Sequence, residues 1–290
     1  MNRHSGSRWR RWWLAISLLF ALLAAGGYLA LDRWQRGLIF SVELGEQRWW
    51  REAPAGTDVF DLTLANGDTV RAWFLAQDDP AAPTVLYLHG SRWNLNGSVF
   101  RMERWHRLGF SVLAIDYRGF GASTPRLPSQ RSATEDALAG LDELARRQPD
   151  PQRRYVYGHS LGGAIAAQLA ALSKRPEFSG LILESTFTHV RDMLPLTRWG
   201  HLPGLAGLVT QPFDTQAALR QYDGPLLLLH GSGDRVVPVA MSDALYAGLP
   251  PGAALRQHVV IEGASHSGAG RYREYDEAVL GFVELLLSDR

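Results

Sequence analysis

The fold is indicated most strongly by eight residues, Tyr155-Val156-Tyr157-Gly158-His159-Ser160-Leu161-Gly162. The first three have the apolar character of a buried strand, and the alanine-rich run from Ala164 to Leu172 predicts a helix directly after them. Between strand and helix, two glycines flank the serine as in a nucleophile elbow, where the chain turns so sharply that larger side chains would clash. A glycine-rich helix start is the alternative, but the strand before and the helix after favour the elbow. The pattern predicts Ser160 as a nucleophile exposed above a sheet.

A serine hydroxyl is a weak nucleophile at neutral pH, so it needs a general base and an acid that orients the base. Of the nine histidines, His266 alone lies just beyond the last predicted strand, in the run of small residues Gly263-Ala264-Ser265-His266-Ser267-Gly268. Small residues let a loop bring an imidazole over the serine. We predict His266 as the general base, with a solvent-exposed loop histidine as the alternative.

Three carboxylates at predicted strand ends compete for the role of the acid. Asp234 follows the strand Leu226–Leu229 in the loop Gly231-Ser232-Gly233-Asp234, which is the strand end before that of His266. Glu184 ends the preceding strand and is a genuine competitor. Asp116 precedes the serine in sequence, and we interpret it as a structural residue of its own loop. We predict Asp234 as the acid.

Backbone N–H groups that bind the oxyanion of a tetrahedral intermediate contribute roughly 3 to 4 kcal/mol each. We expect one from Leu161, at the helix start, and one from Ser91, in the loop after the strand Val85–Leu88. Arg92, the next residue, is a possible substrate-binding residue for an anionic substrate, or simply an exposed loop arginine. We expect no cofactor or metal at this site.

Outward from the serine, short apolar segments alternate with helix-length segments from about residue 58. The alternation predicts a mostly parallel central sheet with helices on both faces. Two further strand-like segments flank Asn66-Gly67, a dipeptide typical of tight hairpins, so an antiparallel hairpin opens the sheet. Predicted strands are 59–64, 69–76, 85–88, 112–115, 154–157, 181–183, 226–229 and 258–261, and predicted helices lie near 98–108, 132–147, 161–174, 239–249 and 271–288.

One long irregular segment, 188–224, interrupts this alternation, and an insertion of that length in such a sheet is usually a lid. We expect its apolar side chains to roof an acyl pocket, with packing against the domain itself as an equally common fate, and we take Trp199 as a possible substrate-binding residue. The apolar residues concerned are Leu194, Leu196, Trp199, Leu202, Leu205, Leu208, Val209 and Phe213.

Near the amino terminus, residues 14–31 contain no charged residue. At 1.5 Å per residue this segment spans about 27 Å, enough for the core of a bilayer. Aromatic residues flank it, as they do at membrane interfaces. We therefore predict a tail and single-pass membrane anchor in 1–36, a linker in 37–57 and a hydrolase domain in 58–290. The alternatives are a signal peptide cleaved after the small residues Ala24-Ala25-Gly26 and a buried core helix.

Arginines before the apolar segment favour a cytoplasmic amino terminus, with the domain on the outer, periplasmic or extracytoplasmic side, although arginines beyond it weaken the contrast. The net charge of +1 falls to about −4 once residues 1–36 are set aside, so no basic surface remains for nucleic acid. The chain has no cysteine, which excludes thiol catalysis and disulfides. The expected partners are the membrane and a small-molecule acyl substrate, and the sequence leaves the oligomeric state open.

Together, His89-Gly90-Ser91, Asp116-Tyr117-Arg118-Gly119-Phe120-Gly121, the serine elbow, Gly231-Ser232-Gly233-Asp234 and Ser265-His266 resemble the α/β-hydrolase superfamily. Within it the chain is similar to membrane-anchored hydrolases of the Bem46/ABHD13 type and to the serine aminopeptidase-like group. The resemblance implies an α/β-hydrolase fold and a serine hydrolase of carboxylic esters or thioesters that forms an acyl-enzyme. A peptidase on the same triad and a noncatalytic binding protein on a hydrolase fold are the other interpretations.

Overall fold

The computed structural model describes residues 5–43, 45, 49–200, 203–252 and 254–288. Its centre is an eight-stranded sheet in the order β1-β2-β4-β3-β5-β6-β7-β8. The pairs from β4 to β8 are parallel. β2 pairs antiparallel with β1, as the predicted hairpin requires, and antiparallel with β4 as well. The strands are β1 (Asp58–Thr63), β2 (Thr69–Leu75), β3 (Thr84–Leu88), β4 (Ser111–Ile115), β5 (Arg154–His159), β6 (Gly180–Glu184), β7 (Leu226–Gly231) and β8 (Arg256–Ile261).

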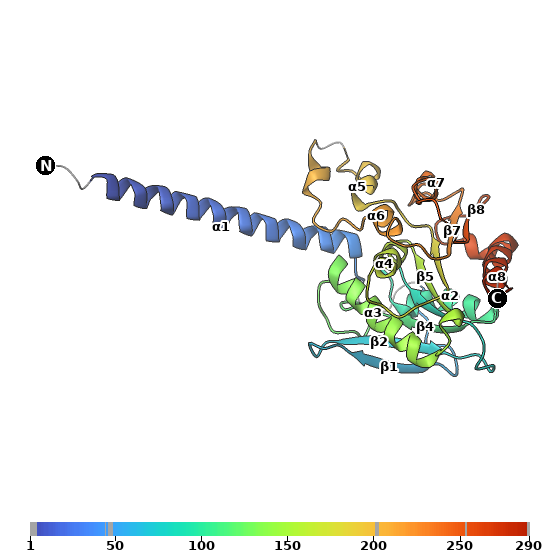
Figure 1. Ribbon diagram of the computed structural model, residues 1–290. Coiled ribbons are helices and arrows are strands. Elements are labelled where there is room, and N and C mark those ends of the chain that lie inside the picture. The colour runs from blue at the N-terminus through green and yellow to red at the C-terminus, as the bar shows by residue number, and fades with distance from the viewer. Residues whose placement is uncertain (1–4, 44, 46–48, 201–202, 253, 289–290) are drawn as a thin grey trace.

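Helices cover both faces of this sheet (Figure 1). Alternate side chains of the parallel strands enter two separate apolar cores, so every residue of β3, β4, β5, β6 and β7 is buried. The helices α3 (Gln130–Arg147), α4 (Leu161–Ala170), α6 (Thr215–Leu219) and α7 (Ala240–Ala247) pack on one core, and α2 (Leu95–Arg107) and α8 (Arg273–Ser288) pack on the other. These features confirm the predicted fold class.

The helix boundaries follow local capping chemistry. The side chain of Asn94 accepts a hydrogen bond from the N–H of Gly97, so α2 begins at Leu95, three residues before the predicted start. A capping box between Ser129 and Ser132 likewise starts α3 at Gln130. Conversely, α4 ends at Ala170, four residues before the predicted end.

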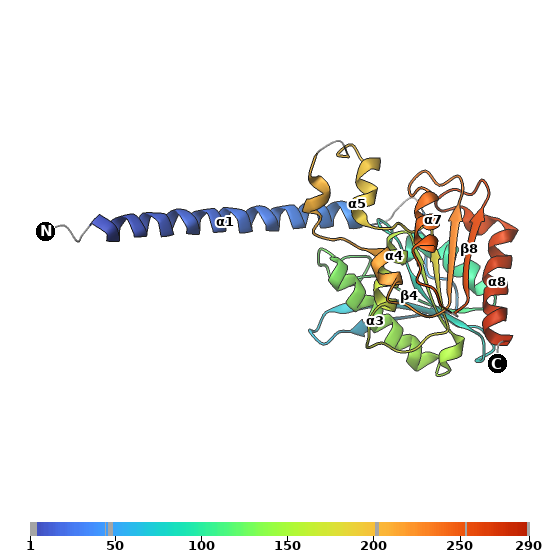
Figure 2. The same ribbon diagram turned by 45° about the horizontal axis from the view of Figure 1, so that its top comes forward.

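The segment predicted as a lid lies over the carboxyl ends of the strands, and its described residues, 188–200 and 203–224, form short helical turns. They are α5 (Val190–Met193), two 3₁₀ turns (Leu194–Leu196 and Leu205–Leu208) and α6. In Figure 2 this segment rises beside the end of the amino-terminal helix.

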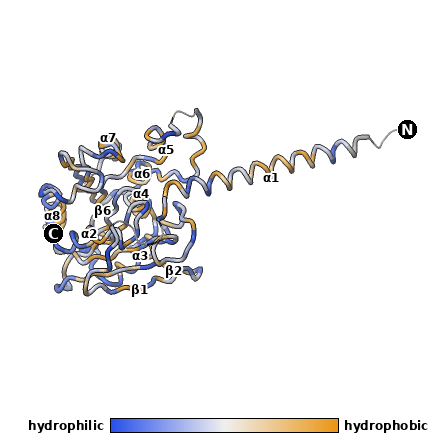
Figure 3. Tube along the Cα trace, turned by 180° about the vertical axis from the view of Figure 1, so that it is seen from behind, coloured by the Kyte–Doolittle hydropathy of each residue, from blue (hydrophilic) through white to orange (hydrophobic). Residues whose placement is uncertain are grey.

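The amino-terminal helix α1 (Ser5–Phe40) projects from the rest of the molecule (Figures 1 and 2). Leu14 and Phe20 are each 68% exposed on it, and its middle is largely hydrophobic in Figure 3. The helix is long and apolar enough to cross a membrane. The helix continues past the boundary predicted at residue 36 to Phe40, which is fully buried against the domain. Residues 37–40 are therefore the last turn of α1.

Candidate active site

The turn between β5 and α4 places Ser160 at the carboxyl end of a central strand. Its backbone has φ 56° and ψ −121°, a conformation that is rare for a residue with a side chain. A Cβ on Gly158 would overlap the carbonyl oxygen of Gly162, and a Cβ on Gly162 would overlap that of Leu88. Both flanking glycines are thus required by close backbone approach, as the sequence pattern predicts.

Three predicted residues meet above this turn. The Nε2 atom of His266 lies 3.1 Å from the Oγ of Ser160, and its Nδ1 lies 2.7 Å from the Oδ2 of Asp234. These residues come from the loops after β8, β5 and β7, which open at the same edge of the sheet. The imidazole is 17% exposed and the carboxylate is fully buried. The arrangement gives a hydroxyl, a base and an orienting carboxylate in one hydrogen-bonded row.

The buried carboxylate of Asp234 is held ionised by its donors. The backbone N–H groups of Val236 and Val237 donate to Oδ1 at 2.8 and 2.9 Å, and Nε2 of His230 lies 3.3 Å from Oδ2. Burial raises the pKa of Asp234, but the contacts with His230, His266 and the backbone outweigh it and lower that pKa below its ordinary range. A charged carboxylate beside His266 stabilises the imidazolium form.

The two competing carboxylates have other partners. Glu184 accepts a hydrogen bond from the hydroxyl of Tyr157 at 2.5 Å, and its carboxylate lies 4.0 Å from the guanidinium of Arg101. Asp116 accepts the N–H of Leu95, the first residue of α2, at 2.9 Å. Both carboxylates therefore bind other groups near their strand ends, whereas Asp234 contacts the imidazole of His266.

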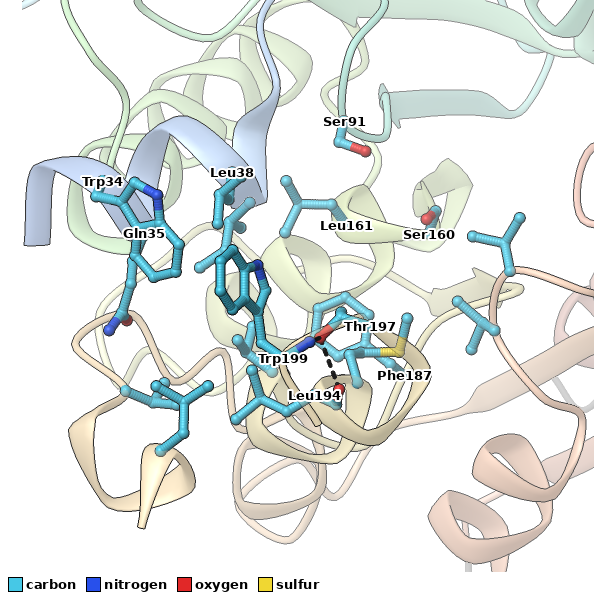
Figure 4. A pocket seen from close by; sticks show the side chains of 17 residues that line it. Trp34, Gln35, Leu38, Ser91, Ser160, Leu161, Phe187, Leu194, Thr197 and Trp199 are labelled. Carbon is cyan, nitrogen blue, oxygen red and sulfur yellow. Dashed lines mark hydrogen bonds between the residues drawn. The ribbon is translucent and has the colours of Figure 1, made fainter. Parts of the chain in front are cut away.

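The predicted oxyanion groups lie beside the serine. A Cβ on Gly90 would lie 3.3 Å from the Cβ of Ser160, so the loop after β3 passes directly against the elbow. Ser91 follows in this loop, and Leu161 is the first residue of α4, where a helical N–H has no carbonyl one turn earlier. Figure 4 shows Ser91, Leu161 and Ser160 at the same end of a cavity.

This apolar cavity has a volume of about 260 Å³ and extends from Ser160 beneath the lid. Of the apolar lid residues, Leu194, Trp199, Leu205 and Val209 line it, as predicted for a roof. Phe213 instead is fully buried in the core, and Leu196 and Leu208 are 53% and 55% exposed. Leu202 lies outside the described residues.

A second, more polar cleft of about 780 Å³ is also lined by Ser160, together with His266. Arg92 lines it, but the guanidinium is 63% exposed and lies 2.9 Å from the carboxylate of Glu43. Arg92 is thus at the solvent side of the cleft. The buried Arg101 reaches the same cleft from α2, with Nη2 2.9 Å from the Nε2 of His159.

Sequence reasoning missed two groups of residues at the site. The first group is Arg101 and His159. Nε2 of His159 lies 2.8 Å from the backbone oxygen of His266. Burial and the charge of Arg101 hold the pKa of His159 well below its ordinary value, so it is neutral there. The second group is on α1. Four residues of one helix face, spaced as adjacent turns require, line the apolar cavity: Trp34, Gln35, Leu38 and Ile39.

The sheet topology and the hydrogen-bonded row at its edge are those of an α/β hydrolase. Comparison with known proteins agrees: residues 79–213 match the family profile described as "Serine aminopeptidase, S33". The α/β hydrolase domain-containing protein WAV2 of Arabidopsis thaliana is 32% identical over 250 residues, covering 79% of this chain and 80% of that protein. The chain therefore belongs to the α/β-hydrolase superfamily, and this membership supports hydrolase activity.

Two further likenesses bear on the site. The lysophosphatidylserine lipase ABHD12 of Mus musculus is 31% identical over 244 residues, covering 78% of this chain and 57% of that protein. A solved esterase structure from Pyrococcus furiosus aligns with a TM-score of 0.64 at 19% identity, covering 85% of this chain and all of that one. The second likeness is one of fold.

Proposed function

We propose that this protein is a serine hydrolase that cleaves carboxylic esters or thioesters through an acyl-enzyme intermediate. The observation that carries the proposal is the row of hydrogen bonds from Ser160 through His266 to Asp234, at 3.1 and 2.7 Å. This row is the geometry that activates a serine hydroxyl at neutral pH.

In the acylation step, Ser160 Oγ attacks the carbonyl carbon of the substrate while Nε2 of His266 takes the hydroxyl proton. Asp234 stabilises the resulting imidazolium through Nδ1–H, and the N–H groups of Ser91 and Leu161 bind the oxyanion. The tetrahedral intermediate then collapses: the bond to the alcohol or thiol breaks, and His266 returns the proton to that leaving group. An acyl ester on Ser160 remains.

Deacylation repeats these steps with water. His266 removes a proton from a water molecule, whose oxygen attacks the acyl carbon, and the same N–H groups bind the new oxyanion. Collapse breaks the bond to Ser160 Oγ, which recovers its proton from His266. The products are a carboxylic acid and the free enzyme.

The apolar cavity beside Ser160 supports an acyl group as the recognised part of the substrate. Its walls are largely aliphatic and aromatic side chains, which stabilise each buried methylene by about 0.8 kcal/mol. The likeness to a lysophosphatidylserine lipase supports a lipid ester as the substrate class. The family profile described as serine aminopeptidase favours the second candidate, a peptidase on the same residues.

Residues 14–31 of α1 hold the protein in a membrane as a single-pass anchor, with the hydrolase domain on the outer side. The anchor is supported by the exposed apolar surface of α1, which is far larger than soluble proteins leave in water. The orientation is supported by Arg8, Arg10 and Arg11 before the apolar segment.

Labelling with a fluorophosphonate tests the nucleophile directly. The full-length protein is expected to be labelled, and Ser160→Ala is expected to lose both labelling and ester turnover. Ser267→Ala is the matched control, because this serine lines the polar cleft beside His266 yet has no role in the proposed chemistry. Ester turnover that persists in Ser160→Ala would contradict the proposal. Faster cleavage of aminoacyl amides than of esters would favour the peptidase.

A further inference from the structure

The end of the anchor helix is attached to the lid. Gln35 Nε2 donates to the carbonyl oxygen of Leu208 at 2.7 Å, and the N–H of Thr210 donates to Gln35 Oε1 at 2.8 Å. The ring of Trp34 packs edge to face on that of Trp199, with centroids 6.0 Å apart. Figure 4 shows these α1 side chains opposite Ser160 across the apolar cavity. α1 and the lid therefore form one continuous wall of the cavity.

The same helix end also holds the loop that carries the proposed oxyanion donor. The N–H of Arg92 donates to the carbonyl oxygen of Phe40 at 2.9 Å, and the N–H of Glu43 donates to the carbonyl oxygen of Arg92 at 3.2 Å. Arg92 has φ 76°, a left-handed conformation that persists only where the surroundings impose it. The orientation of the adjacent Ser91 amide thus depends on where α1 ends.

The position of this helix end relative to the bilayer follows from its length. The uncharged segment ends at Leu31, and the cavity-lining residues from Trp34 to Ile39 lie about 5 to 12 Å farther along the axis. The headgroup layer of a bilayer is about 5 to 8 Å deep on each side. The cavity therefore borders the membrane interface, where Leu38 on α1 and Leu208 on the lid are 51% and 55% exposed.

We propose that residues 32–40 of α1 are a working part of the active site, which accepts the acyl chain of a lipid directly from the bilayer. This proposal rests on the serine hydrolase and membrane anchor proposed above. The helix end forms one wall of the acyl cavity and braces the loop of Ser91. A volume of about 260 Å³ is below the range of about 300–1,000 Å³ typical of drug-sized pockets, so the cavity takes one acyl chain, and not two.

Leu38 tests the wall, since it lines the cavity from α1. In the full-length protein in detergent, Leu38→Trp fills the cavity and is expected to lower kcat/KM for p-nitrophenyl decanoate relative to butyrate by about tenfold. Leu38→Ala enlarges the cavity and should shift the same ratio towards the longer chain. Opposite shifts from one position cannot arise from general unfolding. The matched control is Leu29→Trp, on the same helix within the apolar segment, which should leave the ratio unchanged.

All rates are normalised to the fraction of Ser160 that a fluorophosphonate labels. If labelling persists but both Leu38 variants keep the wild-type ratio, the proposal that α1 forms a wall of the acyl site is wrong, and the proposed serine hydrolase activity is unaffected. If the wild-type protein is neither labelled nor active, the proposed function itself fails.

The source of the acyl chain is tested by dilution within the bilayer. The full-length protein is reconstituted in phosphatidylcholine vesicles that contain p-nitrophenyl decanoate. The initial rate per enzyme molecule is expected to follow the mole fraction of ester in the bilayer. It should stay constant when the vesicle suspension is diluted with buffer at a fixed ratio of enzyme to lipid. A rate that instead follows the aqueous ester concentration would overturn direct uptake from the membrane.

Discussion

At the level of single residues, their contacts distinguish Asp234 from Glu184 and Asp116, the other two carboxylates at predicted strand ends. Asp234 and Glu184 both end on the edge of the sheet where Ser160 lies, so their positions in the chain distinguish them poorly. Their hydrogen bonds do distinguish them. Asp234 contacts the imidazole of His266, and Glu184 is bound to the hydroxyl of Tyr157.

Asp234→Asn is therefore expected to lower kcat by about 10⁴, as loss of the acid does in other serine triads. The amide no longer stabilises the imidazolium of His266 and no longer fixes the tautomer of its neutral form. Glu184→Gln should cost far less, since it keeps the shape of the side chain and leaves His266 untouched. Steady-state kinetics on p-nitrophenyl butyrate measures both. A larger loss in Glu184→Gln would transfer the role of the acid to β6.

At the level of elements, the lid shows how one irregular segment divides its apolar residues among different surroundings. In the 3₁₀ turn Leu205–Leu208, Leu205 lines the apolar cavity and Leu208 is 55% exposed. Phe213, which precedes α6 in the same segment, packs on Phe40 of α1. A roof and a core contact thus come from the same stretch of chain.

Leu205→Ala and Leu208→Ala form a matched pair, because the same truncation is made at the two ends of one turn. Each buried methylene of the acyl chain contributes about 0.8 kcal/mol, or about fourfold in rate. We expect kcat/KM to rise from p-nitrophenyl acetate to hexanoate in the wild-type protein. The optimum should shift to longer chains in Leu205→Ala, which enlarges the cavity, and stay unchanged in Leu208→Ala. Equal chain-length profiles in all three proteins would remove the lid from the acyl site.

At the level of the whole molecule, α1 joins a segment long and apolar enough to cross a membrane to a wall of the cavity beside Ser160 in a single helix. Its outer part is exposed and apolar, whereas Gln35 and Phe40 at its other end are buried against the lid and the core. Truncation near Arg36 would remove Trp34 and Gln35 and open the cavity. A shortened protein that begins at Asp32 would retain both.

The full-length protein is expected to stay in the membrane fraction after washing with alkaline carbonate, since residues 14–31 carry no charge that would favour water. A reporter at the carboxyl terminus should be active only on the outer side if the arginines before the segment set the orientation. Sequencing the mature amino terminus provides the control. A terminus near Gly27 would show that the segment is removed as a signal peptide.

The features that could be predicted from the amino-acid sequence are local ones. Buried parallel strands are short apolar runs, and the elbow needs glycines beside Ser160. Both patterns can therefore be recognised within about ten residues of sequence. Ser160, Asp234 and His266 can be expected to meet because parallel strands all present their carboxyl ends at one edge. These patterns were enough to predict the fold class and to select the three residues that the structure brings into hydrogen-bond contact.

Which distant segments share the site depends instead on long-range packing. Gln35 and Leu208 are 173 residues apart, and Arg101 and His159 are 58 apart; no spacing in the chain signals either contact. The apolar pattern of α1 predicts a helix in lipid, yet the same helix continues to Phe40, which is buried in protein. The pattern does not show where along the helix these surroundings change. Periodicity reports that a face is apolar, and only packing determines what that face meets.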